Sequence, residues 1–204
     1  MIPLNTQHLT GILGLANQVE PKTKALPYLE LDSMMLSQVV EIAQKVSQND
    51  INRLHIQNWV RRKYLSKPYK KKYNREQVAN ILLINDLRNI LPLEQISALL
   101  RFVNQDLPDQ AGDRIHPAKL YRYYSDIFDR TRQDWEKMIG QLAAEVEDSL
   151  APEDMREEDR STAGVTLMIL NLLARANVYK QIAGNWLEKM AGERNSPENS
   201  KEEG

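Results

Sequence analysis

The sequence contains no cysteine, only three histidines and only eight glycines among its 204 residues. Without cysteine the chain has no disulfide, no thiolate ligand for a metal and no cysteine nucleophile. His8, His55 and His116 lie far apart and share no ligand spacing, so they do not predict a metal site. The scarcity of glycine and the lack of an internal repeat of about 20 to 50 residues argue against fibrous and repeat architectures.

Long hydrophobic runs are also missing. The N-terminal segment Met1–Asn5 lacks the basic start and unbroken apolar run of a signal peptide, and the most apolar stretch, residues 163–174, is too short to span a bilayer. No Gly-rich phosphate loop and no nucleophile elbow stand out. The eight acidic residues between Glu145 and Asp159 are more typical of a solvated helix end than of a catalytic pair. We therefore predict a cytoplasmic protein that is not an enzyme, spans no membrane and needs no cofactor.

Charge is strongly segregated along the chain. The net charge is only −1, but residues 53–75 hold nine Lys and Arg and no Asp or Glu, so the rest of the chain carries −10. Ile56, Trp59 and Leu65 are among the apolar residues that interleave this basic block. The block therefore belongs to a folded element rather than to a disordered tail.

Periodicity and capping signals predict a head of helices with a small extended wing between Met34 and Val103. Asn74 and Gln77 form a variant of the capping box at the start of one helix, and Pro92 starts the next. The expected helices run from a cap at Asp32 or Ser33 to Val46 and over 53–63, 74–91 and 93–104. Between the second and third of them an extended segment runs through Pro68 and returns at Tyr73, with the basic wing over 67–75.

The second half of the chain is predicted to be helical, which makes the expected fold class all-α with a small wing. The expected parts around the head are an N-terminal arm over 1–33, a linker over 104–117, a helical domain over 118–190 and a disordered tail over 191–204. Within the helical domain we expect one helix over 118–150 and another over 162–190.

Two apolar seams run along these last two helices. The first contains Phe128, Trp135, Met138, Leu142 and Val146, and the second contains Leu167, Leu170, Ala174 and Val178. The seams can pack on each other within one chain, but residues 163–190 carry apolar side chains on more than one face, which favours a homodimer. On this view a fragment that ends near Val103 folds but binds its target weakly.

The same half is where we expect any small-molecule effector to bind. Its aromatic residues, Tyr121, Tyr123, Tyr124, Phe128 and Trp135, are nevertheless more typical of a core than of a ligand pocket.

The helix predicted over 53–63 has two different faces on a 3.6-residue wheel. Its inner face carries Ile56, Trp59 and Val60, and its outer face carries Gln57, Asn58, Arg61 and Arg62. Arg can bind guanine with two hydrogen bonds, Asn or Gln can bind adenine, and the major groove of B-DNA admits one helix. The outer face therefore predicts contacts to base edges, with Arg53 and His55 beside it.

The wing that follows is rich in Lys and Tyr. Its candidate contact residues are Lys67, Tyr69, Lys70, Lys71, Lys72, Tyr73 and Arg75. Such side chains can lie along phosphates or enter a minor groove. A solvated basic surface without a ligand is the alternative interpretation, but the order of helix, turn, basic helix, wing and capped helix favours a DNA-binding head.

These residues carry a family resemblance. The stretch Asn58–Pro68 resembles the recognition helix and wing entry of MerR-type regulators, and Lys72–Val78 resembles their wing exit. More closely, Leu26–Leu31 ahead of the head and Arg75–Leu87 after the wing resemble the YkrK-like family of MerR-like proteins. The resemblance implies a winged helix-turn-helix that binds DNA over about residues 26 to 103.

Two features depart from the MerR pattern. About 30 residues precede the head, whereas MerR proteins begin almost directly with it. The helical half also lacks the cysteine pair that metal-sensing members use, which puts metal sensing in doubt.

We therefore predict a sequence-specific transcription regulator that binds double-stranded DNA as a homodimer. One rival is an adaptor in which the same basic head docks an acidic protein or RNA. A second rival is an enzyme of unrecognised type, which would need a concave site with perturbed acids.

Overall fold

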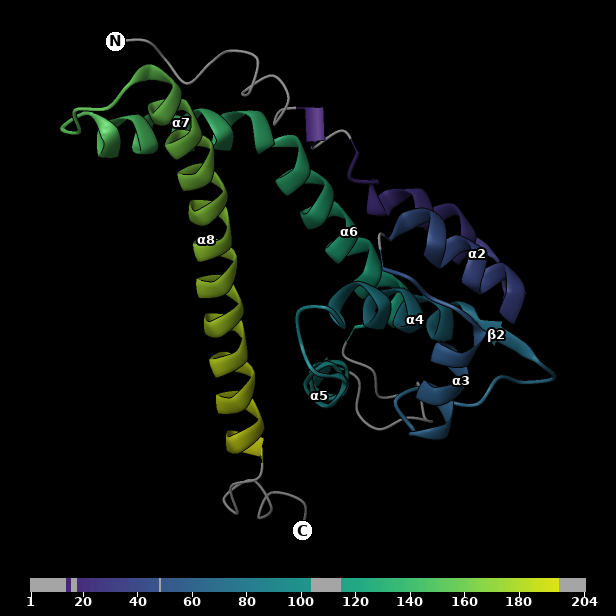
Figure 1. The fold of residues 1–204 in the computed structure, drawn as a ribbon. Coiled ribbons are helices and arrows are strands. Elements are labelled where there is room, and N and C mark those ends of the chain that lie inside the picture. The colour runs from purple at the N-terminus through teal and green to yellow at the C-terminus, as the bar shows by residue number, and fades with distance from the viewer. Residues whose placement is uncertain (1–13, 16–17, 48, 104–114, 195–204) are drawn as a thin grey trace.

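The computed structural model describes residues 14–15, 18–47, 49–103 and 115–194. Residues 104–114 of the predicted linker (104–117) and residues 195–204 of the predicted tail (191–204) lie outside the described residues. Within the described part, helices dominate and one two-stranded sheet is present (Figure 1). The predicted all-α class with a minor strand component is confirmed at this coarse level.

In the segment from residue 33 to residue 103, each of two short strands is followed by two helices. Strand β1 (Ser33–Met35) pairs antiparallel with β2 (Lys72–Asn74), so that Met34 lies opposite Tyr73. The helices of this segment are α2 (Leu36–Val46), α3 (Arg53–Arg61), α4 (Arg75–Leu87) and α5 (Leu93–Val103). The predicted order of helices is confirmed.

Three of the predicted boundaries in this segment are wrong. Residues 33–35 form β1 rather than the first turn of a helix, because their backbone pairs with β2. The next helix, α3, ends at Arg61 rather than at residue 63, and α4 ends at Leu87 rather than at residue 91. Strand pairing depends on a partner far along the chain, which local periodicity does not report.

Helix α4 forms the centre of the head. Every residue from Gln77 to Asp86 is buried, so this helix is covered on all sides rather than along one stripe. Its apolar side chains join Ile42 of α2 and Trp59 of α3 in one hydrophobic cluster. This cluster determines which side of α3 faces outward.

The head also includes segments from outside its predicted limits. Residues Lys22–Glu30 form a 3-10 helix, η1, whose Ala25 and Leu29 are buried in the same cluster. Helix α6 (Pro117–Gln133) adds Tyr121, which is 0% exposed. The core of the head therefore includes η1, from the predicted arm over 1–33, and the start of α6, from the predicted helical domain over 118–190.

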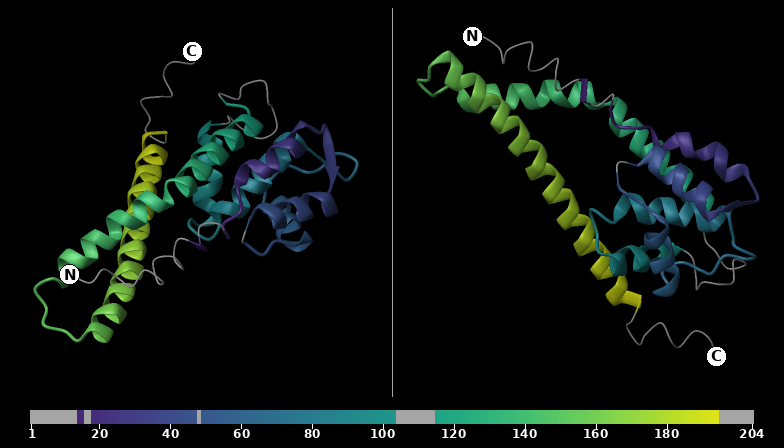
Figure 2. Two further views of the ribbon diagram at one scale, coloured as in Figure 1. Left: turned by 90° about the horizontal axis from the view of Figure 1, so that it is seen from above. Right: turned by 45° about the vertical axis from the view of Figure 1, so that its right-hand side comes forward.

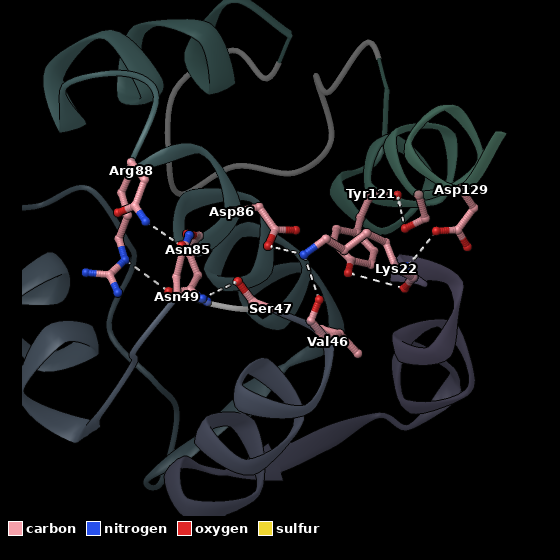
Figure 3. A network of polar contacts seen from close by, with 11 residues as sticks. Lys22, Val46, Ser47, Asn49, Asn85, Asp86, Arg88, Tyr121 and Asp129 are labelled. Atoms are coloured by element: carbon pink, nitrogen blue, oxygen red, sulfur yellow. Dashed lines mark hydrogen bonds and ion pairs between the residues drawn. The ribbon is translucent and has the colours of Figure 1, made fainter. Parts of the chain in front are cut away.

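A buried polar network ties these pieces together (Figure 3). Nζ of Lys22 lies 2.6 Å from Oδ1 of Asp86 and donates a 2.6 Å hydrogen bond to the carbonyl of Val46. The Asp129 carboxylate of α6 accepts hydrogen bonds from the backbone N–H groups of Lys22 and Thr23, at 2.8 and 3.2 Å. The pKa of the Asp86 carboxyl is raised, because the effect of burial exceeds the lowering by the nearby Lys22 ammonium. The network therefore fastens η1 to α2, α4 and α6 at once.

The aromatic residues at the start of α6 mostly serve the core. The ring of Tyr124 lies between those of Tyr121 and Phe128, with centroids 6.2 Å from each. Burial raises the pKa of both Tyr121 and Tyr124. Tyr123, by contrast, is 46% exposed and lies beneath Nζ of Lys119, 5.7 Å from its ring centroid.

The helix predicted over 118–150 is in fact two helices, because Asp134 separates α6 from α7 (Trp135–Leu150). Helix α8 (Glu157–Arg194) begins earlier than the predicted residue 162, and three acidic residues in its first turn are favourable at a helix N-terminus. Figures 1 and 2 show that α7 and the start of α8 lie beyond the head, and that α8 runs back toward α5.

A second, smaller hydrophobic cluster joins α7 to α8. Leu142 and Val146 are buried in it, and Leu167 packs against it. Leu170 and Val178 of the predicted second seam remain 54% and 51% exposed. Helices α7 and α8 therefore pack on each other within one chain, but of the predicted second seam only Leu167 is among the residues packed against this cluster.

Candidate nucleic-acid interface

Helix α3 has the inner and outer faces that the sequence predicted. Ile56 and Trp59 are 0% and 3% exposed and belong to the core of the head. Gln57, Asn58 and Arg61 are all exposed on the other side of the helix. In Figure 1, α5 lies between α8 and α3.

The N-terminus of α3 is held by a capping box that uses one of the predicted contact residues. The Asn52 side chain accepts hydrogen bonds from the N–H groups of Leu54 and His55, and Nδ1 of His55 accepts one from the Asn52 N–H at 3.2 Å. The His55 ring also stacks on Trp59, with centroids 6.5 Å apart. His55 is therefore half-buried and occupied in shaping the helix start, while Arg53 beside it is exposed.

The C-terminus of α3 ends in a left-handed residue. Lys63 has a φ of 61°, and the N–H groups of Lys63 and Tyr64 donate to the carbonyls of Val60 and Trp59. This is the Schellman pattern, which usually places glycine at the left-handed position. The helix therefore stops two residues earlier than its sequence period suggests.

Arg62 is exposed but not free of partners. Its Nη2 lies 2.8 Å from Oε1 of Glu94 on α5, and the hydroxyl of Tyr64 donates to the same oxygen at 2.6 Å. This hydrogen bond from Tyr64 is the main cause that lowers the pKa of Glu94, and it also raises the pKa of Tyr64. Arg62 is therefore available to a ligand only when it leaves this exposed ion pair, and separating such a pair costs little.

The tip of the wing is a tight turn built from lysines. Lys70 and Lys71 have φ values of 46° and 65°, and the Lys72 N–H donates to the Tyr69 carbonyl at 2.8 Å. Positive φ at both central residues defines a type I′ turn, which normally selects Asn-Gly. The turn projects three exposed lysines and the ring of Tyr69, which is 76% exposed.

The base of the wing is fastened to the start of α4 by Gln77. Its Oε1 accepts from the Asn74 N–H, which completes the predicted capping box with Asn74. Its Nε2 donates to the carbonyls of Ser66 and Lys67, at 3.1 and 3.0 Å. One buried side chain therefore caps the helix, as predicted, and also positions the wing, which was not predicted.

Tyr73 does not belong to the surface on which the sequence prediction placed it. It is 3% exposed, lies opposite Met34 in the sheet, and has its pKa raised by burial. The side chain is buried because alternate residues of a strand face opposite sides, and here the inner side meets the core. Its neighbours Lys72 and Lys71 remain exposed.

The cations of this surface are only partly neutralised. Arg75 lies 3.3 Å from the exposed carboxylate of Asp32, and Arg62 pairs with Glu94. Within the described chain, no ion pair involves the remaining cations of the block, which are Arg53, Arg61, Lys63, Lys67, Lys70, Lys71 and Lys72. The outer face of α3 and the wing therefore form a continuous basic segment of chain.

Helix α3 exposes one further side chain, Leu54, that was not among the predicted contact residues. Leu54 is 68% exposed, and it precedes Gln57 and Asn58 by three and four residues. Residues at this spacing share a helix face. The same wheel that selected the polar outer face would have shown Leu54 on it.

The histidines and acids do not gather into a site in the described part of the chain. Nε2 of His116 lies 2.9 Å from Oε1 of Glu76, and His55 is used in the capping box. Among the described residues, no group of three potential metal ligands comes together. None of the described helices is long and apolar enough to cross a membrane.

Comparison with known proteins relates the head to a family. Residues 21–124 match the family described as a domain of unknown function, DUF1836. The uncharacterized protein YkrK of Bacillus subtilis (strain 168) is 29% identical over 97 residues, which are 46% of this chain and 42% of YkrK. The chain thus covers less than half of that relative's length, and no solved structure matches it.

The matched region agrees with the core of the head. It begins just before η1 and ends inside α6, which are the two segments that the core adds to the predicted head. The predicted resemblance to YkrK is confirmed, whereas the likeness to MerR-type regulators is a proposal.

Proposed function

We propose that this chain, which belongs to the DUF1836 family, is a transcription regulator that binds double-stranded DNA with sequence preference. Helix α3 lies in the major groove, and the wing over residues 67–72 contacts the neighbouring backbone. The head is a winged helix-turn-helix like that of MerR-type regulators, made of α2, α3 and the β1–β2 sheet with its wing.

One observation carries this proposal. Gln57, Asn58 and Arg61 are exposed together on a helix whose other side is anchored by Ile56 and Trp59. Their amide and guanidinium groups match the edges of adenine and guanine in the major groove. Because the anchor prevents α3 from rotating, these side chains are presented in one fixed direction.

The wing supplies affinity without sequence preference. Lysines at its tip have no acidic partner in the described structure, so they are available to phosphates. Contacts to phosphates release bound counterions and therefore make binding dependent on salt. The order of helix and wing along the chain brings both kinds of contact to one duplex.

The test compares three nucleic acids. A duplex selected from a random pool, an unselected duplex and an RNA duplex of the selected sequence are titrated by fluorescence anisotropy. We expect preference in that order, because the deep, narrow major groove of A-form RNA excludes a helix. Equal or tighter binding of the RNA, or no binding of any duplex, would contradict the proposal.

Two variants test the assignment of α3. Arg61→Ala and Asn58→Ala should each reduce the preference for the selected duplex by about 1–3 kcal/mol, while binding to the unselected duplex changes less. Lys180→Ala is the control, because this exposed lysine lies on α8. If the α3 variants weaken both duplexes equally, α3 does not read bases.

We further propose that the protein is a homodimer joined through α8. Along this helix Met168, Leu172, Arg175, Tyr179, Ile182 and Trp186 recur at alternating steps of four and three residues. Such spacing is typical of a helix that packs along one seam against another helix.

Helix α7 covers only the first half of this seam. Met168 is buried against α7, and Arg175 pairs with Glu145 of α7 at 2.8 Å. Tyr179, Ile182 and Trp186 are 65%, 57% and 67% exposed. Because α7 has 16 residues and α8 has 38, α7 is too short to reach them, and a second copy of the helix is the occupant we propose.

Light scattering at micromolar concentration tests the dimer. Ile182→Glu should convert the dimer to a monomer, whereas Leu173→Glu should not, because Leu173 is equally exposed but lies off the seam. A monomeric mass for the unaltered protein, with and without DNA, would refute the dimer.

Helix α3 is about 13 Å long and therefore reads few base pairs. Two linked heads should accordingly bind one duplex more tightly than a single head does.

A further inference from the structure

We propose that Leu54 reads the 5-methyl group of thymine in the bound DNA, so that it is a specificity-determining residue of the outer face of α3. This inference rests on the proposed function, because it requires α3 to lie in the major groove. It goes further by naming the base that one apolar residue selects.

Leu54 lies on the outer face of α3. It is the second residue of α3, and Gln57, Asn58 and Arg61 follow it at three, four and seven residues. These four side chains form one stripe along the outer face. Leu54 is therefore the N-terminal member of the same row as the polar side chains that face DNA.

The fold makes little use of the Leu54 side chain. It is 68% exposed, and among the described residues it belongs to neither hydrophobic cluster. Its backbone N–H serves the Asn52 cap, but any residue except proline supplies that group. A single exposed leucine is common on protein surfaces, but Leu54 stands in one stripe with Gln57, Asn58 and Arg61.

Two neighbours of Leu54 in the first turn are already used by the fold. His55 is occupied by the capping box and by stacking on Trp59, and Ile56 is buried. The side chains left to meet a base at this end of α3 are therefore Arg53 and Leu54. Only Leu54 lies in the row of Gln57, Asn58 and Arg61.

The chemistry of the major groove then identifies the base. The thymine 5-methyl group is the one apolar feature that the four bases of DNA present there. An isobutyl side chain has no hydrogen-bonding group, so it favours this methyl group over the polar edges of the other bases. Asn58 or Gln57 would then pair with adenine and Arg61 with guanine. The part of the DNA site that one head contacts therefore has its A·T pairs toward the N-terminus of α3.

The test replaces single thymines of the selected duplex by uracil, which removes only the methyl group. For the unaltered protein, we expect uracil at one or two positions to weaken binding about fourfold each, the equivalent of one buried methyl group. The Leu54→Ala variant should bind the thymine duplex more weakly than the unaltered protein does. It should bind that duplex and the duplexes with uracil at those positions with equal affinity.

The control is Gln57→Ala, which should retain the difference between thymine and uracil there. Urea unfolding of Leu54→Ala should match that of the unaltered protein, because the side chain is exposed. If Leu54→Ala still distinguishes uracil from thymine, or if no position responds to uracil, the inference is refuted. Failure to bind any duplex would instead refute the proposed function.

Discussion

The wing-tip lysines combine an unfavourable backbone with a useful charge. A left-handed conformation costs roughly 1–2 kcal/mol for a residue with a Cβ, and Lys70 and Lys71 both adopt it. Asn-Gly would satisfy the same type I′ turn at lower cost. An observed backbone outlier of this kind supports a functional hypothesis, and the hypothesis here is that the turn places positive charge at the end of the wing.

The double variant Lys70→Asn, Lys71→Gly should therefore have a more stable fold and weaker DNA binding. We expect the free energy of unfolding in urea to rise by about 1–2 kcal/mol. The slope of log affinity against log salt should fall by about 0.9 for each phosphate that the variant no longer neutralises. Lys72→Gln is the control, because Lys72 has no positive φ and should change the slope alone. An unchanged slope in both variants would exclude the wing from the interface.

The Lys22–Asp86 pair is a second residue-scale feature with a measurable consequence. Both side chains are more than nine-tenths buried, and Oδ2 of Asp86 has no hydrogen-bond partner in the described structure. Desolvation of two buried charges offsets most of their attraction, so such a pair contributes more to a specific arrangement than to stability. Removing one partner leaves an uncompensated charge in the core.

We expect Lys22→Met and Asp86→Leu to reduce the free energy of unfolding by about 3–5 kcal/mol each. The double variant should lose less than either single variant, because no charge is then left buried. A double-mutant cycle from urea unfolding measures this coupling. Additive losses would show that the two residues act independently.

At the scale of elements, the wing depends on the helix that follows it. Gln77 joins α4 to the wing through two different atoms of one amide group, as the acceptor of the capping box and as the donor to the wing carbonyls. The position of the wing is therefore set by a helix that is itself fixed in the core. This connection explains how an extended segment with so little sheet pairing has a defined direction.

Gln77→Glu separates the two roles. Glutamate keeps the acceptor for the Asn74 N–H but turns an oxygen toward the carbonyls of Ser66 and Lys67. We expect a loss of about 1–3 kcal/mol in unfolding free energy and weaker binding to all duplexes. Gln38→Glu is the matched control, because Gln38 accepts the corresponding bond from Met35 at an exposed helix start. Similar losses in both variants would mean that the donor atoms of Gln77 do not matter.

On the scale of the whole molecule, the head extends from η1 to α6. Ala25, Leu29 and Tyr121 complete its core, and Lys22 neutralises Asp86 inside it. The structure therefore changes the expectation that a fragment ending near Val103 folds. Such a fragment lacks α6 and leaves one side of α4 uncovered.

A fragment of residues 18–133 should accordingly unfold cooperatively, whereas residues 34–103 should not. Circular dichroism during thermal unfolding distinguishes the two, because an incomplete core gives low helicity and no transition. The longer fragment should bind the selected duplex more weakly than the full chain, since it lacks α8 and the second head. A cooperative transition of equal stability in the shorter fragment would show that η1 and α6 are dispensable.

The features that the sequence predicted correctly are local ones. The inner and outer faces of α3 follow from residues three and four apart, and the Asn74–Gln77 capping box spans one helical turn. The density of positive charge between residues 53 and 75 is a property of composition alone. Interactions within about one turn are visible in the sequence because the backbone geometry of a helix determines them.

The tertiary structure alone decided the features that depend on distant partners. Tyr73 left the surface because its strand pairs with β1, and η1 joined the head because α6 binds it from about a hundred residues away. The three-residue strand β1 carries no periodicity of its own. A buried position or an ion pair such as Lys22–Asp86 depends on which segments the whole chain brings together, and that choice minimises the free energy of all contacts at once rather than of any one segment.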